Sequence, residues 1–478
     1  MKIEIKNFGP IKNIIFDLSK DLNIIYGNNA IGKSYATYCL YCLIKNIKDK
    51  VAYPYYSYYN APDNKFAAFI KNKFKSLKNN QGKKITKSFI KFIEDDLKKI
   101  ILGNLQNSLL NTFSSLKNLK NRYTDLNYEI IIHLSSTERI RIISDNDGQL
   151  DLLYEYGIKE IELILKDTVS TKYTLTGDGK KIFGKPTEEV FCEYFSRLVA
   201  SKVNDICEKL DYNIRDVYYL PASRSGLYQA LNAFTPIIAE LTQNRFFIQN
   251  KSIELPSLSE PLSDYFIDLS TIDKKNINTE YSEIIEKLQN DLLKGEVKYD
   301  DKTKRILYKP NNVDLELNLS EASSMVAEIS PLVIYFKHIL NYKYSSAKNS
   351  FLYGAYSRRR KKKEKGYDIL FIEEPEAHLH PEVQIKLMEI FVELTKLNMK
   401  IFITSHSNYM FNKVNNILIK NEIDAKKMSV YHLIKDIDHS SIEGNMKVDK
   451  DGINDENFQD VSESLYMERL NFYSENDD

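Results

Sequence analysis

The pattern G-x-x-x-x-G-K-S over residues 27–34 constrains this chain more than any other feature, because it specifies a loop between a strand and a helix. Apolar residues 22–26 precede it and predict a short buried strand, and residues 35–47 predict a helix. In that context the backbone N–H groups of the loop converge on phosphate oxygens at the helix N-terminus. The sequence therefore predicts a nucleotide-binding loop, and a glycine-containing turn that matches by chance is the alternative.

The residues of this loop are expected to take different parts in binding. Lys33 would neutralise the β- and γ-phosphates, and the hydroxyl of Ser34 would take a position on Mg²⁺. We therefore expect ATP and Mg²⁺ as ligands. The predicted nucleotide-binding residues of the loop are Gly27, Asn28, Asn29, Ala30, Ile31, Gly32, Lys33, Ser34 and Tyr35.

Composition is typical of a soluble protein with more than one structural unit. The length of 478 residues exceeds one ordinary domain, and a hydrophobic fraction of 43% is enough for real cores. No apolar run approaches the length of a membrane-spanning helix, and residues 1–16 alternate like a strand without a signal-peptide core. We therefore expect a cytoplasmic protein. The net charge of +1 by itself says nothing about nucleic acid.

The four cysteines do not make a disulfide framework. Cys39 and Cys42 lie in the helix predicted after the loop, where a Cys-x-x-Cys pair could be half of a zinc site. Cys192 and Cys207 do not supply a matching second half, so we expect buried thiols in a reducing cytosol.

Five segments are predicted along the chain. Strand-like stretches between residues 128 and 177, separated by turn signals, predict an antiparallel sheet, and a hairpin is predicted within 297–320. Two polar, helical insertions interrupt an otherwise α/β pattern. The segments are a first lobe with the loop at 1–59, a helical insertion at 60–127, a β-rich part with a return helix at 128–235, a second helical insertion at 236–295, and a second lobe at 296–478.

A second group of candidate residues follows an apolar run at residues 368–372. This run predicts a buried strand, and it ends in the acids Glu373 and Glu374. Two acids at the end of a buried strand fit a Walker-B element. Glu373 would then lie on the Mg²⁺ side, and Glu374 would polarise the attacking water as a general base.

Two other interpretations of these acids stay open. They could form an acidic cap before a helix, because Pro381 suits a first helical turn. They could also belong to a transition-metal site, because His378 and His380 stand close by. A further strand, at residues 400–404, ends near His406, which could hydrogen-bond a γ-phosphate or be an ordinary histidine at a strand end.

The order of these motifs carries a family resemblance. A P-loop, long insertions, a serine-rich helix start, "ILFIEEPEAHLHP" and "ITSH" together resemble the ABC-type ATPase heads of the SMC, RecF and OLD-like class of the AAA family. Within that class the chain resembles ATPase subunits of anti-phage systems such as Septu, PARIS and retron-associated systems. The resemblance covers about 1–50, 211–230 and 296–410. It implies an α/β ABC-ATPase head with a mixed parallel sheet, an antiparallel β subdomain and helical insertions.

The resemblance also implies roles for single residues. Residues 27–34 match Walker A, Glu373 the Walker-B acid, Glu374 the catalytic glutamate and His406 the switch histidine. Residues 376–381 take the place of the D-loop. Signature serines in the family contact the γ-phosphate held by the opposite protomer, and the matching residues here are Ser323 and Ser324.

Two residues depart from the family pattern. Glu373 stands where an Asp is usual, and a longer carboxylate can still ligate Mg²⁺ directly or through water. Met325 stands where the signature has a glycine. Without that glycine, close approach of the backbone to a partner's nucleotide is no longer assured by the pattern. No glutamine is assigned to a Q-loop.

Two basic features have more than one interpretation. Arg224 follows an apolar strand in a short turn, where it could recognise a phosphate or carboxylate, or be a surface arginine paired with a nearby acid. The run at residues 357–366 could follow a nucleic-acid backbone or be a solvated loop, because no aromatic residue is interleaved for base stacking.

From these features we expect an ATP-hydrolysing ABC-type module that senses or scaffolds in an anti-phage system and controls a separate nuclease or toxin. Its partners would be a second copy of the chain, joined through composite ATP sites, and that effector; nucleic acid is a further candidate partner and a membrane is not. A self-contained DNA-processing enzyme of the OLD type would need a nuclease domain, and the segment after His406 is short for one. A DNA-bridging ATPase of the SMC type would need a long coiled coil, and neither insertion sustains a heptad pattern. A repair or recombination ATPase of the RecF or SMC type, acting directly on DNA, is the alternative.

Overall fold

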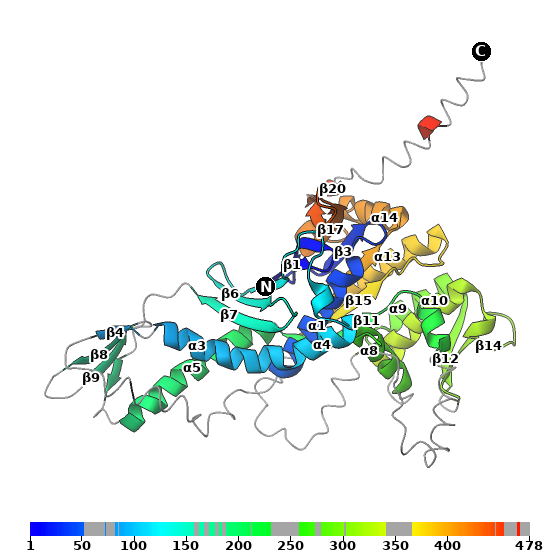
Figure 1. Cartoon of the computed structure of the whole chain (residues 1–478). Helices are drawn as coiled ribbons and strands as arrows, with labels where there is room; N and C mark the ends of the chain where they lie inside the picture. Colours follow the sequence, from blue (N-terminus) through cyan, green and yellow to red (C-terminus); the bar gives the residue numbers. More distant parts are fainter. Residues whose placement is uncertain are drawn as a thin grey trace, which may run out of the picture. The chain divides into compact units, whose positions relative to one another are not determined.

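The chain forms two compact units, each described here by itself. The first unit comprises Met1–Leu18 and Cys42–Tyr212, and the second comprises Ser19–Tyr41 and Asn213–Asp478 (Figure 1). The computed structural model describes residues 1–51, 72, 82–84, 86–156, 162–166, 172–176, 181–183, 188–211, 213–230, 258–272, 279–300, 303–340, 366–444, 446–453 and 466–468.

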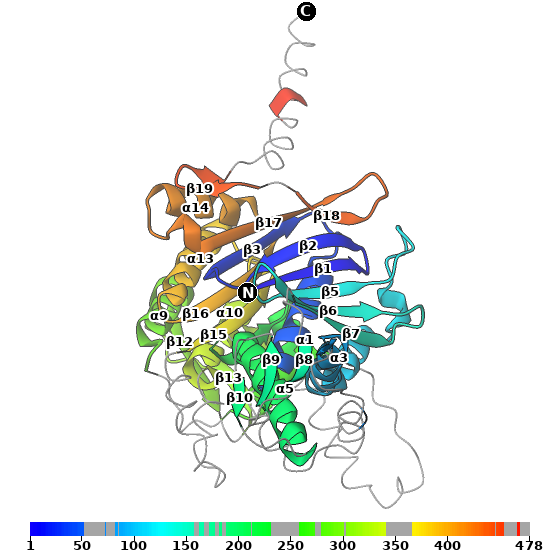
Figure 2. The same cartoon turned by 90° about the vertical axis from the view of Figure 1, so that its left-hand side faces the viewer.

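The first unit contains an antiparallel sheet that begins with a hairpin. Residues 1–16, predicted as one strand, form two strands instead, because Gly9 adopts a φ of 55° and the chain reverses at Gly9 and Pro10. Figure 2 shows the strands side by side. Their order is β2 (Ile11–Asp17), β1 (Lys2–Phe8), β5 (Glu129–His133), β6 (Glu138–Ser144) and β7 (Leu150–Tyr156).

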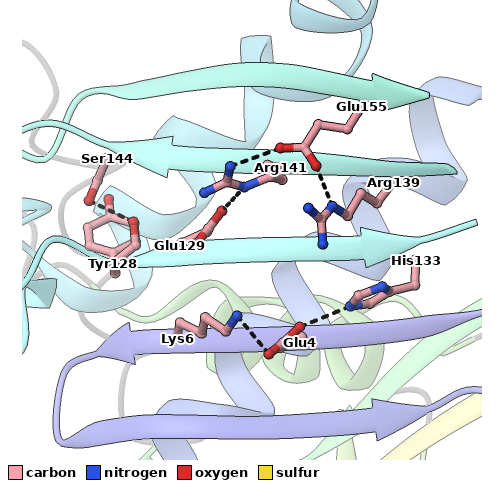
Figure 3. A network of polar contacts seen from close by, with 9 residues as sticks. All are labelled: Glu4, Lys6, Tyr128, Glu129, His133, Arg139, Arg141, Ser144 and Glu155. Atoms are coloured by element: carbon pink, nitrogen blue, oxygen red, sulfur yellow. Dashed lines mark hydrogen bonds and ion pairs between the residues drawn. The ribbon is translucent and has the colours of Figure 1, made fainter. Parts of the chain in front are cut away.

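Side chains alternate between the two faces of this sheet, as the period of two in a strand requires. Arg141 lies between Glu129 and Glu155, with 2.9 Å from its Nη1 to Glu155 Oε1, and Glu4 Oε2 lies 3.0 Å from Nε2 of His133 (Figure 3). These cross-strand pairs keep one face polar. The other face is apolar and buried, and it includes Ile3, Ile5, Ile130, Ile132, Ile140, Ile142 and Leu152.

A second antiparallel sheet in the first unit corrects the prediction of a single one. β8 hydrogen-bonds to β4, a strand from the 60–127 segment, and to β9, so the strands after residue 156 build a separate sheet. This pairing joins segments about 80 residues apart, which local strand patterns do not encode. The order is β10 (Lys181–Phe183), β9 (Lys172–Thr176), β8 (Glu162–Lys166) and β4 (Gly82–Lys84).

The described helices of the first unit include the predicted return helix, now placed at α5 (Glu188–Asp211). The 60–127 segment is helical in its described second half, and residues 60–71 and 73–81 of it lie outside the description. Cys42 and Cys207 are buried, as is Cys39 of the second unit. The other helical elements are α3 (Thr86–Leu97), a π-helical segment (Lys98–Leu102), α4 (Gly103–Phe113), a 3-10 turn (Lys117–Leu119) and the second half of α1 (Lys33–Val51).

A mostly parallel sheet organises the second unit and confirms the predicted α/β class with a mixed sheet. Because its central strands are parallel, their carboxyl ends lie at one edge, where open α/β sheets place their ligands. β18 alone runs antiparallel, next to β17. The order is β11 (Ile214–Leu220), β15 (Tyr367–Glu373), β16 (Met399–Ser405), β3 (Leu22–Gly27), β17 (Met428–Lys435) and β18 (Ser441–Gly444).

Helices cover this sheet through alternating residues of its strands. On one face, alternate strand residues join a large apolar core with α10 (Ser324–Ile334), α13 (Pro381–Thr395) and α14 (Asn408–Ile419). On the other, Phe371 stacks on Tyr219 and Phe402 at centroid distances of 5.9 and 4.8 Å, and Tyr41 of α1 packs edge-on against Tyr219. The two faces of the sheet are therefore packed by alternate residues of its strands. These strands include the predicted ones at 22–26, 368–372 and 400–404.

The remaining elements of the second unit include the predicted hairpin, formed by β12 and β13. Residues 236–257 and 273–278 of the predicted second insertion, and residues 357–365 of the basic run, lie outside the description. None of the helices described in either unit is long and apolar enough to cross a membrane. The elements are α8 (Glu260–Ser270), α9 (Ser282–Lys287), π-helical segments at Leu288–Leu293 and Tyr335–Ile339, β12 (Gly295–Asp300), β13 (Arg305–Pro310), β14 (Leu317–Asn318), 3-10 turns at Leu319–Glu321 and Ala425–Lys427, β19 (Val448–Asp449) and β20 (Gly452–Ile453).

Candidate functional site

The loop between β3 and α1 has the backbone that its glycines predict. Gly27 has a φ of 148° and closely approaches β17, since a Cβ there would lie 2.7 Å from the carbonyl oxygen of Leu433. Gly32 has a φ of 101°, and α1 begins at the next residue. The strand and helix predicted around the loop are confirmed, which places an N-terminal helix dipole beside it.

Lys33 lies at the centre of the site, although it is only 6% exposed. Its ammonium group donates to the carbonyl oxygens of Gly27 and Asn28 at 2.9 and 3.1 Å. It also lies 2.6 Å from Nε2 of His406, at the end of β16. One cation therefore joins the two segments that the sequence singled out at opposite ends of the chain.

The protonation states at this centre follow from burial. Burial lowers the pKa of Lys33 to about 8, against the opposing field of three nearby glutamates. Burial and the Lys33 charge also lower the pKa of His406, so the imidazole is neutral at pH 7. Nε2 of this ring faces both the Lys33 ammonium group, at 2.6 Å, and Oε1 of Glu374, at 3.4 Å.

Glu373 ends β15 with a buried carboxylate. The hydroxyl of Tyr38 donates to its Oε2 at 3.3 Å, while its Oε1 is buried without a hydrogen-bond partner among the described residues. Burial raises the pKa of Glu373, and the hydroxyls of Ser34 and Tyr219 oppose that shift. The loop serine and the first acid, predicted as neighbours, are thus brought together.

Glu374 is more exposed and points toward the histidine. Its Oε1 lies 3.4 Å from Nε2 of His406. Its φ of 39° is unusual for a non-glycine residue, and such strain is found where surrounding contacts hold the backbone. One such contact is its N–H, which donates to the carbonyl oxygen of Thr404 at 2.9 Å.

Glu376 begins the segment that sequence reasoning placed at the D-loop, but it was assigned no catalytic or binding role. Its Oε1 accepts hydrogen bonds from the Ser405 hydroxyl at 2.8 Å and from the His406 N–H at 2.6 Å. Burial raises the pKa of Glu376, and these two bonds oppose the shift. The sequence shows a third acid close to the two candidate acids. Its role could not be predicted from that position, because its hydrogen-bond partners lie at the end of another strand, β16.

The two alternatives for the acids fare differently. The acidic-cap interpretation is wrong, because the N-cap of α13 is His380 and Glu373 and Glu374 lie a full loop before it. For the transition-metal interpretation, the part of the chain that the structure describes contains no group of three or more His, Cys, Asp or Glu side chains arranged to hold a metal ion.

The predicted signature serines begin α10 as expected. Ser323 caps the helix by accepting from the N–H of Val326 at 3.4 Å, and Ser324 is its first residue. Both are exposed, and neither hydrogen-bonds to residues 27–35 in the described parts of this unit. Met325, in place of the family glycine, packs against the apolar core of the unit.

Arg224 is fully buried, so its interpretation as a surface arginine is wrong. It does pair with an acid, Glu328 of α10, but inside the protein, with 3.5 Å between Nη2 and Oε2. Its other partners among the described residues are backbone carbonyl groups, and its side chain faces away from solvent.

The sequence matches a known family over most of its length. The family model described as "AAA ATPase domain" matches residues 1–411, which include the loop, the acids and His406. The chain belongs to the AAA ATPase domain family. It is therefore an ATPase. No curated protein matches the chain.

Several solved structures are similar to the chain at low identity. An SMC head bound to the C-winged helix domain of ScpA is 12% identical, with a TM-score of 0.35 and coverage of 93% of this chain and 96% of that one. The SMC head domain from Thermotoga maritima is 11% identical, with a TM-score of 0.32 and coverage of 94% and 98%. An SMC head domain bound to the C-terminal domain of ScpA, from Pyrococcus furiosus, is 13% identical, with a TM-score of 0.35 and 98% coverage of both chains.

Replacing Glu376 tests its hold on His406. We expect Glu376→Leu to lower kcat for ATP about tenfold, because a hydrogen bond to a charged group is worth about 1.5–3 kcal/mol. Glu376→Gln keeps an acceptor oxygen and should lose much less. Steady-state hydrolysis and the Kd of a fluorescent ATP analogue are the measurements. Equal kcat values for the two variants would contradict this role.

Proposed function

We propose that the ATPase reaction takes place where the loop 27–35 meets the ends of β15 and β16. The observation that carries the proposal is the contact of Lys33 Nζ with His406 Nε2, 2.6 Å apart, with Glu374 3.4 Å from the same nitrogen. A phosphate recognition residue, a neutral imidazole and a carboxylate thus surround one point at the ligand edge of a parallel sheet.

The residues of this site divide the work of phosphoryl transfer. The loop backbone and the first turn of α1 direct N–H groups toward the phosphates, and Lys33 supplies a positive charge to the β- and γ-phosphates. The neutral His406 can hydrogen-bond a γ-phosphate oxygen. Glu374, the more exposed acid, accepts a proton from the attacking water, because its carboxylate can reach solvent within the site.

The residues beside Ser34 fit a magnesium ion. Glu373 Oε1 is buried without a hydrogen-bond partner among the described residues. The Ser34 hydroxyl lies close enough to the same carboxylate to oppose the rise in its pKa. Carboxylate and hydroxyl oxygens are ligands that Mg²⁺ prefers. Glu373 and Ser34 would hold the ion, which supplies charge neutralisation of the β- and γ-phosphates. The longer Glu373, in place of Asp, is held from the side by the Tyr38 hydroxyl.

Two substitutions separate binding from turnover. Lys33→Ala should raise the Kd of ATP at least about tenfold, because a buried charged hydrogen-bond donor is lost. Glu374→Gln should keep the wild-type Kd and lower kcat by about 10²-fold or more, because the general base is removed. Equilibrium nucleotide binding and single-turnover hydrolysis measure the two steps.

An exposed acid provides the matched control for this pair. Glu382, in the first turn of α13, is exposed and outside the site, so Glu382→Gln should change neither the Kd nor kcat. Hydrolysis by Glu374→Gln at the wild-type rate would refute the assignment of the base.

We further propose that two copies of the chain form composite sites. Ser323 and Ser324 are exposed at the N-terminus of α10 and make no hydrogen bond to residues 27–35 among the described residues. An exposed helix N-terminus attracts an anion, and the serines are the residues that match the signature in the family resemblance. Each loop would then face the serines of the other copy across a two-fold axis.

Light scattering tests the composite site. ATP should convert Glu374→Gln protein from monomer to dimer at micromolar concentration, because unhydrolysed nucleotide bridges the copies. Adding Ser323→Arg should prevent the conversion, whereas Ser270→Arg, at an exposed serine that ends α8, should not. A protein that stays monomeric with ATP, or a dimer insensitive to Ser323→Arg, would contradict the proposal.

The biological role we propose is that of a cytoplasmic sensor or scaffold subunit in an anti-phage system, with a separate nuclease or toxin as effector. The support is the resemblance of the motifs to such subunits. Three acids at the end of β15 and in the loop after it, Glu373, Glu374 and Glu376, also lie around Lys33 and would serve the ATP site. A repair ATPase that acts directly on DNA is the competing role.

DNA cleavage assays distinguish these roles. The purified protein, incubated alone with ATP, Mg²⁺ or Mn²⁺ and plasmid or phage DNA, should leave the DNA intact, because its placed acids serve ATP. Glu374→Gln protein is the parallel sample. Cleavage that survives Glu374→Gln would overturn the idea of an effector in trans and favour an enzyme that acts on DNA itself.

A further inference from the structure

Arg224 is among the largest side chains that the second unit buries completely. It begins the helical stretch of residues 224–230 that follows β11. Its Nη1 donates to the carbonyl oxygens of Pro221 at 3.1 Å and of Glu373 at 3.0 Å. A guanidinium group presents several donors in one rigid plane, so a single side chain can tie separate segments together.

The contact with Glu373 bears on the next residue along the chain. The Glu373 carbonyl and the Glu374 N–H belong to the same peptide group. Arg224 binds that group through the carbonyl oxygen, and Thr404 binds it through the N–H at 2.9 Å. A peptide held at both ends fixes the N–Cα bond of the following residue, and that bond together with φ, here an unusual 39°, sets the direction of the Cα–Cβ bond. The direction of the Glu374 carboxylate therefore depends on Arg224.

Arg224 also contacts α10, the helix that begins with the exposed serines. Its Nη2 lies 3.5 Å from Oε2 of Glu328, and its Nε donates to the Glu328 carbonyl oxygen at 3.5 Å. The Ser225 hydroxyl donates to the other oxygen of the same carboxylate. Glu328 is 1% exposed and lies one turn after Ser324. A shift of α10 would therefore move Arg224 with it.

Stability alone does not account for such a pair. Removing two charges from water costs several kcal/mol for each ion, and apolar side chains of similar volume often serve a core equally well. A buried ion pair does impose one relative placement on the segments that it joins. Here those segments are the turn after β11, the end of β15 and α10.

We propose that Arg224 is a positioning residue of the ATPase: it orients Glu374 for hydrolysis and, through Glu328, links that orientation to the place of α10. The inference rests on the proposed role of Glu374 as general base. Occupation of the serine end of α10 would then be communicated to the carboxylate that activates water. Arg224 is fully buried and would act through Glu374, without binding nucleotide or water itself.

Kinetics of Arg224 variants test the positioning role. Arg224→Gln should lower kcat about 10- to 100-fold, because a small misplacement of a catalytic group has effects of that order. The Kd of ATP should stay within about threefold, since the loop and Lys33 are untouched. Arg224→Lys keeps the charge opposite Glu328 but lacks the planar fork. It should fold even where Arg224→Gln does not, and it should also lose kcat at unchanged Kd.

Arg215 is the matched control, because it forms a largely buried ion pair near the start of β11, whereas Arg224 follows the end of that strand. Nη2 of Arg215 lies 2.8 Å from Oδ2 of Asp368, which is 1% exposed near the start of β15. Arg215→Gln and Arg224→Gln should both lower the thermal unfolding midpoint, because each leaves a buried carboxylate without its ion-pair partner, yet Arg215→Gln should leave kcat unchanged. An equal loss of kcat in Arg215→Gln would show a merely structural effect and overturn the proposal.

Glu328→Gln tests the link to α10 separately. If Arg224 and Glu328 act as one unit, Glu328→Gln should lower kcat, and the double variant should lose no more than Arg224→Gln alone. A wild-type kcat in Glu328→Gln would overturn the link. Glu374→Gln, measured alongside, separates the positioning role of Arg224 from the general-base role of Glu374. If it is inactive while both Arg224 variants are at the wild-type rate, the positioning role fails by itself. If Glu374→Gln is active, the assignment of the base fails.

Discussion

Parallel hydrogen bonding among β15, β16 and β3 is the constraint on which the rest of the site depends. The register places Glu373 opposite Thr404, and Ser405 opposite Tyr26. Strands that run in the same direction end at the same edge, so the acids, the histidine and the loop after β3 meet there although they lie hundreds of residues apart. An antiparallel arrangement of the same strands would have sent the acids and the loop to opposite edges.

The meeting of these strand ends buries several charges, and the contacts between them follow from that burial. Lys33, Glu373 and Glu376 all have pKa values shifted toward the neutral form by desolvation. Interactions between charges are stronger where water is excluded, so each group is held by a neighbour from another segment. Arg224 extends this arrangement to α10. The site is thus a set of mutually dependent side chains and not a loop with acids placed around it.

Local sequence patterns predicted the individual strands and helices better than they predicted which strands pair with one another. The strand before the loop, the helix after it, the return helix and the hairpin of β12 and β13 all follow from periodicity and turn residues. The N-terminal segment was predicted as one strand because alternation continues through residues 9–10, where Gly9 reverses the chain. The second antiparallel sheet of the first unit was missed because β8 pairs with β4, from a distant segment.

The sequence by itself determined the phosphate-binding loop, the strand that ends in Glu373 and Glu374, and the serines that begin α10, since each depends on residues close together in the chain. Only the tertiary structure decided that Glu376 holds His406, that the imidazole is neutral beside Lys33, and that Arg224 is buried against Glu328. The physical reason is that a hydrogen-bond partner or a desolvated environment is supplied by whichever segments pack together, and that packing is a property of the whole sheet and its helices.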